Sequence, residues 1–326
     1  MHASPRPGYA LCVIAAFVWA TTSPGMGYVL RTYHTPALTL SFWRDACIAL
    51  TLIVALAIAS VVRGKGLAWL RVERRALRGM AFAGVVGVGL HHALLTPSIL
   101  LNGAALAIVL VYTYPTFVTL GARIFFGERI GTGQLVALAL SLAGCVLLAR
   151  AYDPALLRVS WVGVAVGLGT ALAHAAYVLS SQRTVAQHSP WIALTIPMIC
   201  GALTLLVVAA VVQGPASLVR VGGGLDVWLW MVGLSLPTLG GYALFMLSLQ
   251  HIPGRVASLV VLIEAPVAAG LSVLLLGERL DWPQLVGMGL VLAAAVLPMI
   301  RRKKRGERVK LAEDVRQSAI TQAIGD

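Results

Sequence analysis

Residues 115–134 read PTFVTLGARIFFGERIGTGQ, and residues 266–284 read PVAAGLSVLLLGERLDWPQ. In both stretches a proline stands inside an apolar run, about three helical turns before a Gly-Glu-Arg step. A Gln-Leu pair, starting at Gln134 in the first stretch and at Gln284 in the second, then leads into another apolar run. A helix–turn–helix pattern that occurs twice in one apolar chain indicates two related halves packed as a single membrane body.

The composition supports a membrane protein. The 326 residues are 59% hydrophobic and only 11% charged, and the mean hydropathy is +0.88. No soluble domain of this size needs so much apolar surface. The net charge of +13 could indicate a nucleic-acid partner, but most positive charges lie in two short runs, 63–78 and 301–310. Such runs beside apolar spans are typical of cytoplasmic anchors, so we expect a lipid bilayer and no nucleic acid as partner.

The four cysteines do not indicate a metal site. Cys12, Cys47, Cys145 and Cys200 each lie in an apolar run, and no two have the spacing of metal ligands. They are interpreted as small buried hydrophobic residues, and we expect neither a metal nor a cofactor.

Ten apolar runs are each long enough to cross a hydrocarbon core of about 30 Å. They cover residues 8–30, 36–62, 77–98, 103–125, 132–150, 159–181, 190–212, 227–250, 255–276 and 282–300. The third and fourth runs are divided only by turn signals, Thr96-Pro97 and Asn102-Gly103. The fold class predicted is therefore all-α integral membrane, with ten transmembrane helices.

The ten runs form two five-helix repeats, 8–150 and 159–300, between a short N-terminus, 1–7, and a basic tail, 301–326. An odd number of spans per repeat makes the second repeat enter the membrane from the opposite side, as in inverted-repeat transporters. Most of the 25 Lys and Arg residues lie on one side if both termini are cytoplasmic, and the positive-inside rule favours that orientation. We expect the 215–226 loop to face outward.

The chain resembles the EamA-type branch of the drug/metabolite transporter superfamily. The resemblance rests on Phe42-Trp43-Arg44 and on the two proline-to-Gly-Glu-Arg stretches, the second of which begins with Glu264-Ala265-Pro266. Many relatives have Glu-Pro where this chain has Glu264-Ala265-Pro266. The resemblance implies a ten-helix carrier of the inner membrane, most often an exporter of amino acids, related metabolites or toxic compounds.

Polar side chains within the apolar runs are the candidates for substrate binding. They are Trp19, Arg44, His91, Tyr112, His174, Tyr177 and Tyr242. Such a lining suits amphipathic organic solutes, and an ordinary buried side chain is the alternative for each of them. His91 and His92 are adjacent and cannot share one helical face, so they do not predict a metal pair.

Arg44 has two interpretations. A charge at this depth should face protein or water because lipid disfavours it. It could extend outward as a structural anchor, or it could bind an anionic group of the substrate. Asp45 is adjacent, but neighbours on a helix point about 100° apart, so their pairing does not follow from the sequence.

Glu264 is the acidic residue nearest to a membrane midplane and is the candidate for coupling to protons. The alternative is a protonated glutamic acid that bonds to a neighbouring helix. Pro115 and Pro266 each remove a backbone hydrogen bond, so we expect helix kinks, either functional or merely tolerated.

The function predicted is secondary active transport, with export of a small organic metabolite by alternating access. The chain has no G-x-x-x-x-G-K-[ST] step, which argues against an ATPase, and neither H-E-x-x-H nor G-x-S-x-G. An integral-membrane enzyme and a non-transporting assembly subunit are the alternatives.

Overall fold

The computed structural model describes residues 6–64, 72–157, 159–219, 221–277 and 279–300, and every regular element within them is helical. The elements are α1 (Arg6–Ala20), α2 (Thr22–Thr32), α3 (Ala37–Val62), α4 (Arg74–Phe82), the π-helical η2 (Ala83–Leu90), α5 (His91–Val111), α6 (Tyr114–Phe126), α7 (Thr132–Leu148), α8 (Trp161–Val185), α9 (Pro190–Gln213), η3 (Pro215–Leu218), α10 (Leu225–Ser248), α11 (Gly254–Val260), η4 (Val261–Ile263) and α12 (Glu264–Leu276). A last helix, Trp282–Ile300, follows. The predicted basic tail, 301–326, lies outside the described residues.

The helices are not divided as the sequence predicted. Eight helical stretches of the described residues are long and apolar enough to cross a membrane, and Thr132–Leu148 is a shorter apolar helix, so the exact count of ten is not confirmed. The predicted third and fourth runs share one long helical stretch, Arg74–Val111, broken only at Gly103 with φ 77° and ψ 161°. Glycine adopts this conformation readily, so the chain changes direction without a loop.

Pro115 and Pro266 mark places where a helix restarts. Pro115 stands in the first turn of α6, after a break at Tyr112–Thr113, and Pro266 is the third residue of α12, after the 3-10 segment η4. The first turn of a helix has no partner for its amide hydrogens, so a proline costs little there. Other prolines, among them Pro97, Pro197 and Pro237, lie further inside their helices.

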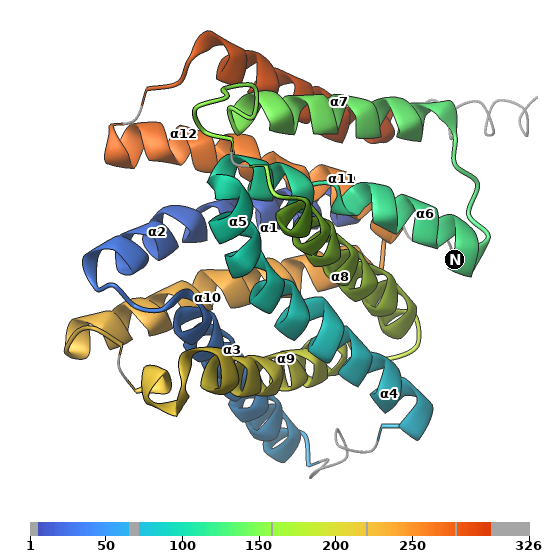
Figure 1. Cartoon of the computed structure of the whole chain (residues 1–326). Coiled ribbons are helices and arrows are strands. Elements are labelled where there is room, and N and C mark those ends of the chain that lie inside the picture. The colour runs from blue at the N-terminus through green and yellow to red at the C-terminus, as the bar shows by residue number, and fades with distance from the viewer. Residues whose placement is uncertain (1–5, 65–71, 158, 220, 278, 301–326) are drawn as a thin grey trace, which may run out of the picture.

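The two Gly-Glu-Arg turns end their helices in the same way. Gly127 and Gly277 have φ of 66° and 67° and cap α6 and α12 in the left-handed conformation. In Figure 1, α6 ends on the right, on the side where the N-terminus lies, whereas α12 ends on the opposite side. The two helices thus run in opposite directions, as an inverted repeat requires.

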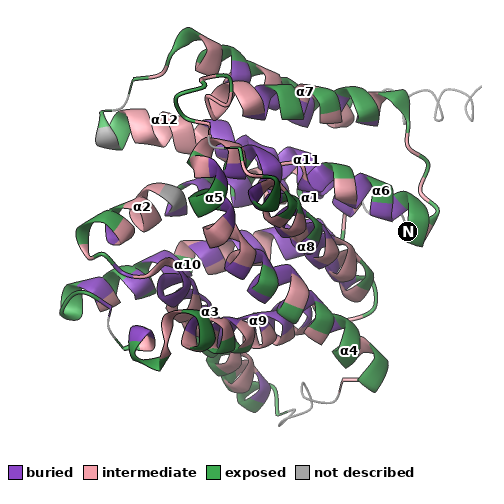
Figure 2. Cartoon of the chain, in the orientation of Figure 1, coloured by how far each residue is buried: buried purple, intermediate pink, exposed green. Residues whose placement is uncertain are grey.

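Helices from early and late parts of the chain pack in pairs: α5 along α8, α1 along α10 and α3 along α9. Small residues allow the close approach, since a Cβ added at Gly87 would lie 2.4 Å from the Cβ of Tyr177. In Figure 2 the buried residues gather towards the centre and exposed ones cover the outer helices. Many exposed residues are large and apolar, such as Trp161 and Leu274, which fits a surface in contact with lipid.

Candidate transport site

A cavity of about 260 Å³ lies among α1, α2, α3, α5, α6, α8, α10, η4 and α12. Seven of its lining residues are ones that the sequence predicted: Trp19, Arg44, His91, Tyr112, His174, Tyr242 and Glu264. Tyr114 and His92, which the sequence also offered as possible lining residues, border the cavity as well, together with three polar residues that the sequence did not single out: Thr22, Ser41 and Thr238. The volume is near the lower end of the range for ligand sites and suits a small organic solute.

The cavity lies where the two interrupted helices come together. Tyr112 stands at the break between α5 and α6, and Glu264 directly follows η4. A break in a helix frees backbone groups, and such backbone is tolerated at membrane depth where it borders protein or a cavity. Both breaks thus place polar atoms at the cavity wall.

One side of the cavity carries a buried charge cluster. Arg44 donates through Nε to Asp45 Oδ1 at 2.9 Å, and its Nη2 lies 2.8 Å from the same oxygen. His92 donates through Nδ1 to Asp45 Oδ2 at 3.0 Å, and its Nε2 lies 3.1 Å from Arg44 Nη2. A neutral imidazole, with its proton on Nδ1 and a lone pair on Nε2, satisfies both contacts. Arg44 is therefore paired within the protein and does not extend outward.

The histidines and aromatic residues form a continuous wall. His91 donates through Nδ1 to the carbonyl of Thr170 at 3.1 Å. Its ring centroid lies 4.7 Å from that of His174, which in turn meets the ring of Tyr114 edge-on at 4.5 Å. Trp19 and Tyr242, which also line the cavity, are packed edge to face at 5.0 Å. Edge-on contacts of this kind fix ring orientation.

Tyr177 lies behind this wall. It is only 1% exposed, and its ring packs against those of His174 and Tyr242 at 6.1 and 5.7 Å. The sequence predicted that Tyr177 lines the cavity, because it lies three positions after His174 and shares its helical face. Tight packing of α8 against Gly87 instead holds Tyr177 between helices.

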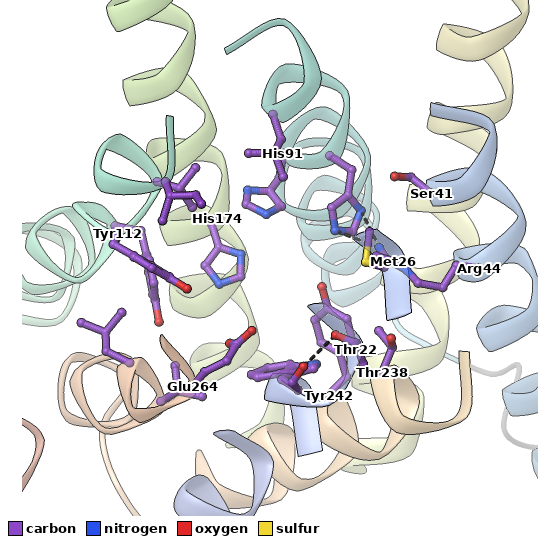
Figure 3. Close-up of a pocket in the computed structure, with 18 residues that line it drawn as sticks. Thr22, Met26, Ser41, Arg44, His91, Tyr112, His174, Thr238, Tyr242 and Glu264 are labelled. Carbon is purple, nitrogen blue, oxygen red and sulfur yellow. Dashed lines mark hydrogen bonds between the residues drawn. The ribbon is translucent and has the colours of Figure 1, made fainter. Parts of the chain in front are cut away.

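Glu264 faces the cavity on the side away from Arg44 (Figure 3). Within the part of the chain that the structure describes, its carboxylate has no hydrogen-bond or ion-pair partner. A carboxylate in a largely apolar setting is costly unless it is protonated, hydrated or matched by a ligand.

The end of the molecule near the N-terminus carries a polar network. Arg255, at the start of α11, donates through Nε to Glu128 Oε2. Gln182 on α8 donates to Glu128 Oε1 at 3.1 Å and accepts from the amide of Gly254 at 2.6 Å. Gln134 donates to the carbonyl of Arg255 at 3.0 Å. The network thus joins the first Gly-Glu-Arg turn to helices from the second half of the chain.

The other end has its own links between the halves. Gln284, the counterpart of Gln134, donates to the carbonyl of Leu148 at 3.1 Å, and Arg150 pairs with Asp281 at 3.3 Å. Glu278, the counterpart of Glu128, lies outside the described residues.

Two segments of the chain, 6–150 and 161–300, match the EamA-like transporter family. The chain belongs to the EamA-like transporter family. The resemblance seen in the sequence is thus confirmed, and family membership identifies a transporter rather than an enzyme.

Relatives with assigned names are transporters and exporters. An uncharacterized inner membrane transporter, YicL of Salmonella typhimurium, is 26% identical over 93% of this chain and 98% of its own length. A probable terminal-alkyne amino-acid exporter of Streptantibioticus cattleyicolor is 28% identical over 91% of this chain and 94% of its own. The threonine/homoserine exporter RhtA of Escherichia coli K12 is 31% identical over 43% of this chain, and the match spans 45% of RhtA.

The sequence did not predict how the charge cluster is assembled. Only one of His91 and His92 was expected to line the cavity, yet two side chains about 100° apart both border its concave wall. Asp45 has a signal in the sequence, an acidic residue deep in an apolar run, but only the position of α5 beside α3 brings His92 to its second oxygen.

Proposed function

We propose that this chain is a secondary active exporter of a small organic solute, an amino acid or a related compound, that works by alternating access. The observation that carries the proposal is the cavity at which the two interrupted helices meet, with a paired arginine on one side and an unpartnered carboxylate on the other. The names of the two amino-acid exporters among the relatives support the substrate class.

Segments 8–150 and 159–300 act as the two units that move against each other. The pairs α1 and α10, α3 and α9, and α5 and α8 form the interface between these units, because each pair joins one helix from either segment. The Glu128–Arg255–Gln182 network is the gate on the cytoplasmic side, and the links at Leu148 and Asp281 belong to the outer side. Both termini are cytoplasmic, and the YicL match supports the inner membrane as the location.

Glu264 couples transport to protons. Its unpartnered position in the cavity supports this role, since a carboxylate there can take up a proton or a cationic group of the substrate as the site changes its access to water.

Transport by purified protein in proteoliposomes tests the proposal, with radiolabelled threonine and homoserine as first probes. Ser41→Trp should abolish uptake because Ser41 lines the cavity and the indole would fill it. The matched control is Leu50→Trp, on the same helix but 62% exposed towards lipid, which should transport like the wild type. Equal uptake by Ser41→Trp and the wild type would remove the cavity from the transport path. Absence of any solute movement would favour an assembly subunit.

A further inference from the structure

We propose that Asp45 determines the charge of the solute that the cavity accepts: it cancels the charge of Arg44 in place, so the site takes solutes that carry an ammonium group and rejects simple anions. This inference rests on the proposed transport function and on the cavity described above.

Asp45 acts from behind the cavity wall. Its side chain is 0% exposed and does not line the cavity, whereas Arg44 and His92 do. Both carboxylate oxygens are in use, one on Arg44 and the other on His92. Figure 3 shows Arg44 beside Met26, whose sulfur lies 3.4 Å from Arg44 Nη1. The guanidinium is thus fixed on several sides.

A carboxylate on a substrate would have to compete with Asp45 for Arg44. Breaking a buried ion pair leaves an uncompensated charge, which is strongly unfavourable. The competition favours Asp45, because it is next to Arg44 in the chain, whereas a substrate loses translational freedom when it binds. Arg44 can therefore give a polar contact to a solute, but it does not supply a free positive charge.

The histidines of the cavity wall do not supply a free positive charge either. His92 satisfies its contacts as a neutral imidazole, and His91 needs only one ring proton to donate to Thr170. His174 Nδ1 is buried without a hydrogen-bond partner among the described residues, so a charged ring there would leave an N–H unpaired. Glu264 is the carboxylic acid among the lining residues, and it faces the cavity without a partner in the part of the chain that the structure describes.

The opposite side of the cavity suits an ammonium group. Glu264 offers two acceptor oxygens, and the rings of Trp19, Tyr112 and Tyr114 lie in the same wall. Aromatic faces attract cations, and a carboxylate does so more strongly where water is sparse. A zwitterion would place its ammonium group here and its carboxylate towards the hydroxyl of Ser41, because the hydroxyls of Thr22 and Thr238 already donate to the carbonyls of Trp19 and Leu234.

Three probes of one carbon skeleton separate the charges: leucine, 3-methylbutylamine, which lacks the carboxylate, and 4-methylpentanoate, which lacks the amine. Binding to the purified protein is measured through the fluorescence of Trp19, with Trp19→Phe as the control for other tryptophans. The wild type should bind the amine and leucine more tightly than the acid.

Asp45→Asn keeps the shape of the side chain and leaves Arg44 uncancelled, so the affinity for the acid relative to the amine should rise about tenfold or more. Arg44→Gln should shift the ratio towards the amine. The double variant Arg44→Gln/Asp45→Asn should return to the wild-type order, because the charges are removed together.

A wild type that prefers the acid, or an Asp45→Asn ratio within about threefold of the wild type, overturns the inference. If Asp45→Asn does not fold, the order of affinities for the three probes in the wild type, in Arg44→Gln and in the double variant still decides whether the inference stands. If none of the three probes binds the wild type, the proposed function falls as well. If the probes bind but Asp45→Asn ranks them as the wild type does, only the role of Asp45 is removed and the proposed function stands.

Discussion

Arg255 binds the carboxylate of Glu128 and thereby joins the start of α11 to the turn after α6. The pair bridges the two matched segments at the end of the molecule where the N-terminus lies. The side chains are 24% and 19% exposed, so solvent screens the pair and it contributes at most about 1 kcal/mol to stability. A contribution of that size is small for folding but sufficient to bias a gate.

Glu128→Gln should therefore open the cytoplasmic side more often. We expect a cysteine placed at Thr238, in the cavity, to react about fivefold faster with a thiol reagent in inside-out vesicles of a cysteine-free background. The exchanged pair Glu128→Arg/Arg255→Glu should bring the rate back towards the wild type. A rate unaffected by Glu128→Gln would show that the pair is not a gate.

Glu264→Gln should fold and insert normally but lose the response of transport to a pH gradient, because the amide keeps the shape of the side chain and cannot titrate. Uptake with and without an imposed gradient is the measurement. Glu73→Gln, at an exposed residue before α4, is the matched control and should keep the response. Retained pH-driven transport in Glu264→Gln would remove Glu264 from the coupling.

The orientation can be read from two exposed residues at opposite ends. Ala216 lies in η3, and Gln187 lies in the turn between α8 and α9. Cysteine at position 216 should react with an impermeant thiol reagent in intact cells, and cysteine at position 187 only after lysis. The reverse pattern would invert the orientation that the Lys and Arg distribution favours.

Gly87→Ala should destabilise the contact between η2 and α8. The added methyl would lie 2.4 Å from the Cβ of Tyr177, and overpacking of this kind typically costs about 1–3 kcal/mol. Gly79→Ala, where nothing lies within 4 Å of the new methyl, is the control. The melting temperature in detergent should fall for the first variant and not for the second. Equal melting temperatures would mean that α8 can shift away at no cost.

The sequence by itself determined the class of protein and its repeated plan. Apolar runs at membrane length exclude a soluble domain, and the duplicated proline-to-Gly-Glu-Arg stretch leads to the family. The left-handed caps at Gly127 and Gly277 follow from the residue type, because glycine adopts positive φ without strain. These features are local, so periodicity and residue identity suffice to predict them.

Only the tertiary structure decided which polar residues meet. Asp45 binds Arg44 on its own helix, and it binds His92 because α5 lies beside α3. Tyr177 leaves the cavity wall because Gly87 admits α8 closely. In a chain that is apolar on nearly every helical face, the pattern does not tell a lipid-facing side from a packed one, so the partners of each buried charge are fixed by helix packing.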